Sequence, residues 1–168
     1  AEGIGRYSYA YSIALYFTYS TLLGLNKYGN RKIASVKSNR AILSRAFSEI
    51  YLMQIICFAI CFIIYLFCSL FIFQDREISL ILGMFVLSSL FDINWFFFGM
   101  EMFDKTVIRN AIIKILTTIL IFVLVKDRND VDKYAMIMSA GYLISQLALW
   151  PYLRKCIDKV HIHVADIR

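Results

Sequence analysis

Five uninterrupted apolar stretches dominate this sequence, and each is long enough to cross a lipid bilayer. The hydrocarbon core is about 30 Å thick, so a helix needs roughly 20 residues to span it. The stretches cover residues 7–25, 50–73, 78–98, 107–125 and 134–153. Their apolar residues do not alternate with a period of two, which disfavours a β-barrel. We expect an all-α integral membrane protein, a bundle of about five transmembrane helices.

The composition agrees with lipid as the solvent. Of 168 residues, 60% are hydrophobic and only 18% are charged, whereas a soluble domain carries about a quarter. The net charge is +6, but no nucleic-acid motif accompanies it, so nucleic acid is not an expected partner. Three of the four cysteines lie in one apolar stretch and are interpreted as small buried hydrophobic residues.

The connections between the stretches differ in charge, and this predicts the topology. Residues 26–45 carry six basic side chains and no acidic one: Lys27, Arg31, Lys32, Lys37, Arg40 and Arg45. Basic connections are retained on the cytoplasmic side. We therefore expect loop 26–48, loop 99–106 and the C-terminus to be cytoplasmic, with helix 7–25 starting outside. An odd number of spans, most simply one, is expected to precede this chain.

Polar residues follow the helical period in most of the stretches. The stripes are Ser8, Ser12, Tyr16 and Ser20; Ser88, Ser89, Asp92, Trp95 and Gly99; Asn110, Lys114, Thr117 and Thr118; and Ser139, Tyr142, Ser145 and Gln146. Such spacing places each set on one helix face. The stripes either let helices pack closely or line a polar passage. Stretch 50–73 contains Gln54 but no clear stripe, and we assign it to lipid.

Asp92 and Lys114 are the charged residues that a membrane segment accepts least readily. An ionised side chain at mid-membrane costs at least about 2.5–3.5 kcal/mol. In straight antiparallel helices, Asp92 lies about 9 Å and Lys114 about 10 Å from the inner ends of their segments. The two would be nearly level, and would either form a buried ion pair or face one wet cavity. Lys114 has a third option, since its long side chain can extend to the interface.

Several stretches together resemble a known family. "AEGIGRYSYAYSIALYF", "GLNKYGNRKIA", "FDINWFFFGMEMF" and "TVIRNAIIKILTTILIFVLVK" resemble the polysaccharide flippases of Gram-negative bacteria, which translocate O-antigen or capsular repeat units. These belong to the multidrug/oligosaccharidyl-lipid/polysaccharide exporter superfamily. The resemblance covers essentially the whole chain. It implies two pseudo-symmetric lobes around a central cavity, of which residues 1–168 would form the N-terminal lobe without its first helix.

The resemblance also implies a function. Such proteins move undecaprenyl-diphosphate-linked oligosaccharide across the bacterial inner membrane for lipopolysaccharide O-antigen or capsule biosynthesis. No cofactor is expected, and coupling to a proton or sodium gradient is compatible with the mechanism. A polysaccharide polymerase and a chain-length regulator are candidate partners beside the lipid-linked substrate and membrane lipid. The alternative is a related exporter of drugs or of other polysaccharide precursors.

The chemistry of that substrate selects the candidate site residues. A diphosphate calls for cations, for which Arg109, Lys114 and, at the inner mouth, Arg31 are available. Sugars call for aromatic faces, hydroxyls and amides. The candidates for this second role are Tyr16, Asn94, Trp95, Tyr142 and Gln146. Asp92 would hold Lys114 in place or take up a proton.

Three features of the sequence have simpler interpretations than a functional site. Trp95 is as consistent with packing as with a sugar platform, and Glu101 is expected to pair with Lys105 at i+4. Cys156, His161 and His163 fit no standard zinc spacing, so no metal site is expected. The membrane segments hold one acid at depth and no histidine, which argues against an enzyme using general-base or metal-assisted chemistry.

Overall fold

The structure is a computed structural model that describes residues 2–127 and 130–157, and within these residues it is helical throughout. The elements in order are α1 (Glu2–Leu22), α2 (Leu25–Val36), α3 (Arg40–Phe71), α4 (Arg76–Ser88), the short 3₁₀ helix η1 (Ser89–Phe91), α5 (Asn94–Gly99), α6 (Phe103–Leu124), α7 (Val131–Leu147) and α8 (Trp150–Cys156). Three helical segments are long and apolar enough to cross a membrane: Arg40–Phe71, Arg76–Gly99 and Phe103–Leu124. The chain is thus a multi-pass membrane protein, and the predicted all-α class is confirmed.

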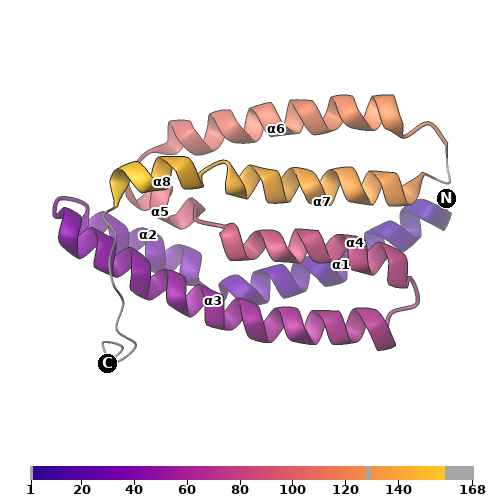
Figure 1. Cartoon of the computed structure of the whole chain (residues 1–168), viewed down its shortest axis with the longest axis horizontal. Coiled ribbons are helices and arrows are strands. Elements are labelled where there is room, and N and C mark those ends of the chain that lie inside the picture. Colours follow the sequence, from indigo (N-terminus) through magenta and orange to yellow (C-terminus); the bar gives the residue numbers. More distant parts are fainter. Residues whose placement is uncertain (1, 128–129, 158–168) are drawn as a thin grey trace.

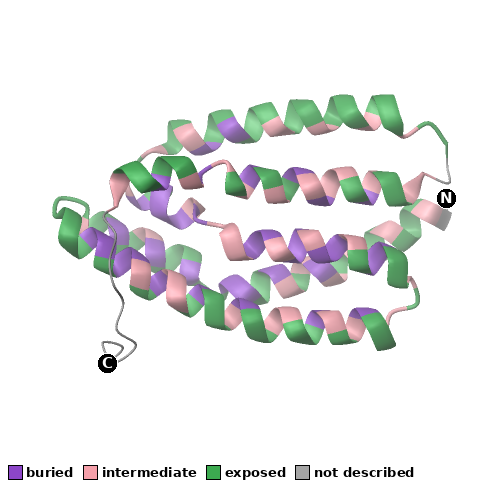
Figure 2. Ribbon diagram, viewed as in Figure 1, coloured by how far each residue is buried: buried purple, intermediate pink, exposed green. Residues whose placement is uncertain are grey.

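The long helices α1, α3, α4, α6 and α7 lie side by side along one direction (Figure 1). α4 is central, because it packs against α1, α3 and α7. α6 lies at the edge, where it contacts α7 and α5, and most of its surface is exposed (Figure 2). One end of the bundle gathers α2, α5 and α8. The opposite end holds the start of α1 and the α3–α4 and α6–α7 connections (Figure 1).

The expected loop 26–48 is wrong, because most of it is helical. Leu25, Gly29 and Ile33 recur every fourth residue and are all buried, so α2 packs as an amphipathic helix despite its many charges. Gly24 makes the sharp turn that precedes it, with φ of 81°. Asn39 then caps α3, its side-chain oxygen accepting from the backbone N–H groups of the next turn. The mean hydropathy of residues 25–36 is low because of their charges, so hydropathy alone does not reveal the buried residue at every fourth position.

α2 and α5 interlock through two glycines. A Cβ on Gly29 would lie 2.7 Å from Cε3 of Trp95, and a Cβ on Gly99 would lie 2.6 Å from Cβ of Ile33. Two of the four segments that carry the family resemblance, 24–34 and 91–103, are therefore the two sides of one interface. Only glycine permits this approach of the two backbones.

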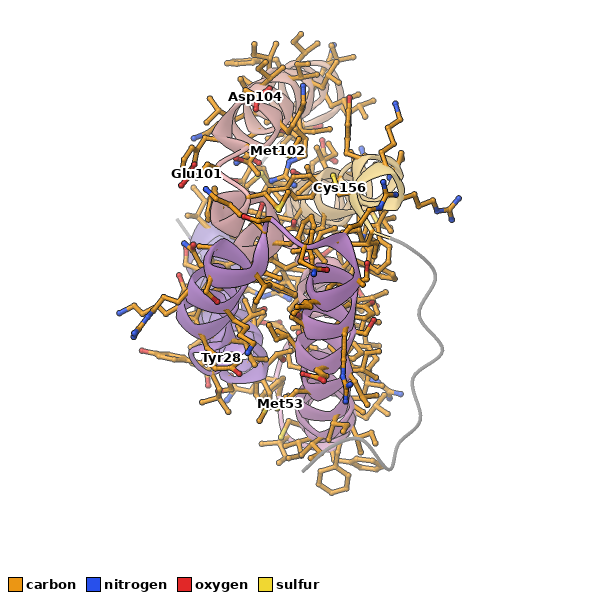
Figure 3. The ribbon with its side chains drawn as sticks, turned by 90° about the vertical axis from the view of Figure 1, so that its left-hand side faces the viewer. Tyr28, Met53, Glu101, Met102, Asp104 and Cys156 are labelled. Carbon is orange, nitrogen blue, oxygen red and sulfur yellow. The ribbon has the colours of Figure 1, made fainter. Side chains whose placement is uncertain are left out.

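The same end of the molecule shows why the expected Glu101–Lys105 pair is wrong (Figure 3). Glu101 lies in the turn between α5 and α6 with φ of 59°, so it does not share a helix face with Lys105. Glu101 instead pairs with Lys37, which follows α2, at 2.9 Å. Lys105 pairs with its neighbour Asp104, also at 2.9 Å.

Two of the expected continuous helices are interrupted. The predicted helix 78–98 breaks at Asp92 and Ile93, where Asp92 adopts an extended conformation (φ −73°, ψ 101°). The predicted helix 134–153 breaks between Leu147 and Trp150. Pro151 explains the second break, because its ring excludes the carbonyl of Leu147 and it has no N–H to donate. The first break has no such residue and is explained by side chains described below.

At the end of the bundle where α1 starts, two carboxylates, those of Asp75 and Asp130, hold the helix connections in place. Arg6 of α1 donates to Asp75 before α4 at 2.9 Å, which holds the pKa of Asp75 below its usual range. Asp130, before α7, pairs with Lys133 at 2.7 Å and accepts from the backbone N–H groups of Lys126 and Asp127. These contacts, the lysine foremost, lower the pKa of Asp130 to about 2.

The interlocked glycines predict a sharp difference between two Gly→Ala substitutions. In Gly99→Ala the new methyl would lie 2.8 Å from the backbone oxygen of Asn30, which cannot move independently of α2. We expect a loss of about 1–3 kcal/mol, the usual range for overpacking, measured by thermal unfolding of the detergent-solubilised protein. Gly5→Ala is the control, because nothing lies within 4 Å of that position. Equal stability of the two variants would contradict the interlocked interface.

The low pKa of Asp130 predicts a pH-dependent contribution to stability. The unfolded carboxyl titrates near its ordinary value of about 3.9, and the folded one at about 2. The stabilisation is therefore complete above pH 4 and is lost as the pH falls towards 2. The difference in unfolding temperature between wild type and Asp130→Asn should be largest at pH 6 and smaller at pH 3. A difference independent of pH would show that the charge of Asp130 is not the cause.

Candidate functional site

The interruption between η1 and α5 is held open by side chains from both sides. Asp92 accepts from Asn94 twice, from the backbone N–H at 3.0 Å and from Nδ2 at 2.7 Å. From α3, Nε2 of Gln54 donates to the carbonyls of Ser89 and Asp92 at 2.7 and 3.0 Å. An apolar bundle offers no water to freed backbone groups, so these side chains replace the missing helical hydrogen bonds. The break is therefore a built feature of α4–α5.

Asn94 connects this break to α6. Its Oδ1 accepts from Nη2 of Arg109 at 3.1 Å, and the same guanidinium donates to Oδ1 of Asn110 at 2.7 Å. α7 completes the cluster, since Oε1 of Gln146 accepts hydrogen bonds from Nδ2 of Asn94 at 3.3 Å and from Nη1 of Arg109 at 3.4 Å. Arg109 is 9% exposed and is thus a nearly buried cation. Its fixed donor fork matches three separate amide oxygens, which a lysine would not do.

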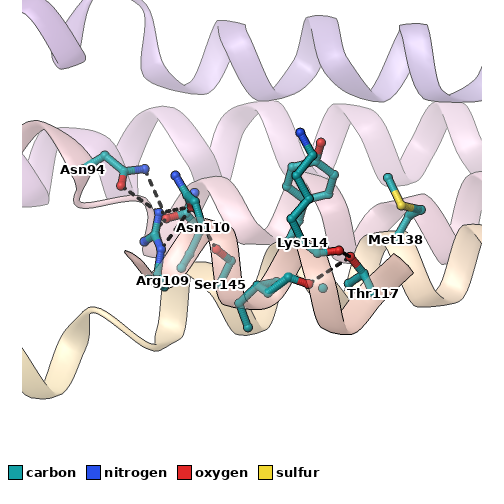
Figure 4. Close-up of a pocket in the computed structure, with 11 residues that line it drawn as sticks. Asn94, Arg109, Asn110, Lys114, Thr117, Met138 and Ser145 are labelled. Carbon is teal, nitrogen blue, oxygen red and sulfur yellow. Dashed lines mark hydrogen bonds between the residues drawn. The ribbon is translucent and has the colours of Figure 1, made fainter. Parts of the chain in front are cut away.

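This cluster forms one end of a cavity of about 370 Å³ between α6 and α7. Asn94, Arg109, Asn110, Ser145 and Gln146 gather at that end, and Lys114, Thr117 and Met138 lie further along it (Figure 4). α6 and α7 approach each other closely within this lining, where a Cβ on Gly141 would collide with Cγ2 of Thr117. The ring of Tyr142 borders the cavity and packs edge-on against Phe85 of α4, with centroids 4.8 Å apart.

The structure does not form the Asp92–Lys114 ion pair. Lys114 is exposed on the cavity side, and Nζ has no ion-pair partner among the described residues. Arg109 is the cation whose charge acts on Asp92, and Asn94 lies between them. The level estimated for Asp92 assumed a straight helix at 1.5 Å per residue, but the chain is unwound there. Lys114 lies about 7.5 Å along α6 from Arg109, the cation that is close to Asp92.

The cavity brings together five of the nine candidate residues, namely Asn94, Arg109, Lys114, Tyr142 and Gln146. The other four lie elsewhere. Asp92 lies behind Asn94 and is not a lining residue. Trp95 is 1% exposed and packs in the core against Phe47, with ring centroids 5.4 Å apart.

Arg31 and Tyr16 do not reach the cavity either. Arg31 is on the exposed face of α2, and Tyr16, 73% exposed, is on α1. Tyr16 shares its exposed face with Ser12 and Ser20, so the polar stripe of α1 points outward from the bundle in this structure.

The sequence interpretation missed Gln54, Asn110 and Ser145 as members of the site. Asn110 and Ser145 stood in the recognised stripes, and in the structure Ser145 donates to Asn110 at 3.4 Å. Gln54 was assigned to a lipid-facing helix, yet it is completely buried. The available signal was the lone amide of the apolar stretch 50–73, since polar groups inside a membrane rarely face lipid.

The arrangement is suited to binding an anionic and hydroxyl-rich group. Its lining presents two cations, three amide-bearing side chains counting Asn94, and hydroxyls from Thr117, Tyr142 and Ser145. The lining residues include no carboxylate, imidazole or thiol, the side chains that bind most metal ions in proteins. Among the described residues no three His, Cys, Asp or Glu side chains gather into a candidate metal site; His161 and His163 lie outside them.

Comparison with known proteins places this architecture in a family. The family model described as "Polysaccharide biosynthesis protein" matches residues 1–167. Searches of curated proteins and of solved structures found no match. The family match extends over all the helices and over the cavity between α6 and α7, so the chain belongs to the polysaccharide biosynthesis protein family of membrane proteins.

Proposed function

We propose that this chain is part of a flippase for undecaprenyl-diphosphate-linked oligosaccharide, which carries repeat units of O-antigen or capsule to the outer face of the bacterial inner membrane. One observation carries the proposal: a cavity inside an apolar helix bundle presents two cations, Arg109 and Lys114, among amides and hydroxyls. A diphosphate and its sugars need such groups, because neither crosses hydrocarbon unaided. Family membership supports the same class of substrate.

The two ends of the cavity offer different chemistry. Arg109 is held by Asn94, Asn110 and Gln146, so its guanidinium is oriented before any ligand arrives. Lys114 is exposed and its ammonium is available for an incoming anion. Tyr142 offers a ring face bordered by Gln146 and Ser145, a combination suited to sugar hydroxyls and C–H groups. We assign the diphosphate to the cations and the proximal sugars to Tyr142 and its neighbours.

The orientation we propose places α2, the α5–α6 turn and α8 in the cytoplasm. These elements gather at one end of the bundle, as alternation of the loops requires (Figure 1). The six basic residues of 26–45 belong to this end, which the preference for basic cytoplasmic segments favours. We further propose that a second lobe faces this one, since transport sites of this kind form between two repeats.

Removal of the cavity cations tests the function. In a strain lacking the gene, full-length protein with Lys114→Met should accumulate normally, because no described residue pairs with that ammonium. Surface polysaccharide should fall about tenfold, since hydrogen bonds to charged groups contribute about 1.5–3 kcal/mol each. Arg109→Ala should have at least this effect. The readout is an immunoblot of O-antigen or capsule, normalised to the amount of protein in the membrane.

Lys126→Ala is the matched control, because it removes the same charge just beyond the outer end of α6, away from the cavity. Accumulation of the lipid-linked repeat in the Lys114→Met strain would identify the blocked cargo. Normal polysaccharide in both cavity variants would refute the proposal. Unchanged polysaccharide with lost drug resistance would instead favour the multidrug exporter.

Thiol labelling tests the orientation. In a background without the native cysteines, Lys126→Cys should react with an impermeant maleimide added to spheroplasts, whereas Ser35→Cys on the exposed face of α2 should react only after permeabilisation. Both positions are exposed in the structure, so lack of reaction reports on the side of the membrane. The reverse pattern would invert the topology.

A further inference from the structure

Gln54 is a buried polar residue of the bundle that does not line the cavity. It belongs to α3, which contributes no lining residue, and its side chain is completely buried. Nε2 donates to the backbone carbonyls of Ser89, Leu90 and Asp92 at 2.7, 3.3 and 3.0 Å. One amide group thus donates to three carbonyls of η1 and the break that follows it.

The other half of the carboxamide fixes its direction. Oε1 of Gln54 accepts from Nε1 of Trp95 at 3.0 Å. The indole cannot move easily, because it stacks on Phe47 and lies directly against Gly29 of α2. The donor side of Gln54 is therefore forced towards the break, and the break is held from the side opposite to the cavity.

The consequence reaches the cavity through two residues. Asp92 takes its extended conformation within the segment that Gln54 holds, and its carboxylate orients Asn94. Asn94 in turn accepts from Arg109 at 3.1 Å. If the segment wound into a regular helix, rotation by one residue would turn Asn94 away from α6, because successive helical residues point about 100° apart.

We propose that Gln54 is a positioning residue for the transport site: its carboxamide keeps residues 89–93 out of a regular α-helix, so that Asn94 holds the Arg109 guanidinium in the cavity. The role in transport rests on the proposed function, whereas the geometric role does not. Gln54 touches no cavity ligand, and its effect is exerted through the backbone.

Tyr65 supplies a matched control for ordinary interhelical bonding. It too lies on α3, is 0% exposed and donates to a backbone carbonyl of α4, that of Ser79, at 2.6 Å. Its partner lies in the regular part of α4, remote from the break. Tyr65→Phe removes a hydrogen bond from α3 to α4, Gln54→Met removes those from α3 to residues 89–95, and both keep most of the side-chain volume. Only the second should alter the cavity.

The experiment measures two quantities in the full-length protein. One is export of surface polysaccharide per amount of membrane protein. The other is the rate at which Ser145→Cys, placed beside Asn110 in the cavity, reacts with a small polar thiol reagent in a background without the native cysteines. We expect Gln54→Met to lower export about tenfold and to change the labelling rate severalfold, because buried groups lose their partners. Tyr65→Phe should leave labelling unchanged and export within about twofold.

The two readouts separate the inference from the proposed function. A changed labelling rate with normal export in Gln54→Met supports the positioning role and refutes export through this cavity. Labelling like that of Tyr65→Phe overturns the positioning role, whether or not export falls, and export lost in Arg109→Ala would then leave the proposed function standing. Should Gln54→Met fail to accumulate, Trp95→Phe replaces it under the same criteria, because it removes the N–H that directs the carboxamide.

Discussion

The fold depends on satisfying backbone groups that an interrupted helix exposes inside an apolar bundle. In hydrocarbon an unpaired carbonyl costs several kcal/mol, so a break in a span exists only where side chains replace the lost bonds. α4–η1–α5 meets this condition with two side chains. Gln54 donates to the freed carbonyls from α3, and Asp92 receives the N–H that begins α5. The carboxylate inside "SSLFDINWFFFG" is thus accepted because it terminates one helix and begins another.

Residues that follow the break contact two different parts of the protein. On one side Trp95 and Gly99 pack into α2, whose Gly29 and Ile33 receive them, so the basic amphipathic helix is locked onto the membrane bundle. On the other side Asn94 reaches α6 and α7. Residues only one position apart therefore serve the core and the cavity. We expect a substitution at the interlocked glycines to affect the cavity without touching it, because Trp95 and Gly99 share the six-residue helix α5 with Asn94.

The sequence predicted what depends on apolar length and charge distribution: the helical class, the presence of segments long enough to cross a membrane, and which connections share an end of the bundle. It failed where local hydrogen bonding overrides periodicity. Asp92 and Lys114 were placed level by counting residues along a straight helix, an assumption that the unwound segment invalidates. Gln54 was assigned to lipid because its helix lacked a stripe, although one buried amide is enough to organise a neighbouring helix. The sequence predicts a loop in place of α2 because the charges there outnumber the three buried residues Leu25, Gly29 and Ile33.

The hydrogen bonds among Asp92, Asn94 and Arg109 determine the net charge that the cavity lining presents. Had Asp92 contacted Arg109 directly, the two charges would have cancelled and left a structural ion pair. Asn94 stands between them instead, and the guanidinium is satisfied by the neutral oxygens of Asn94, Asn110 and Gln146. Its positive charge is oriented but only partly offset, and Lys114 adds a second cation to the same lining. An excess of positive charge in a low-dielectric bundle attracts an anion strongly, and neutral amides around it can exchange partners with sugar hydroxyls. The separation of Asp92 from the cavity by Asn94 thus leaves a lining that suits an anion rather than a cation.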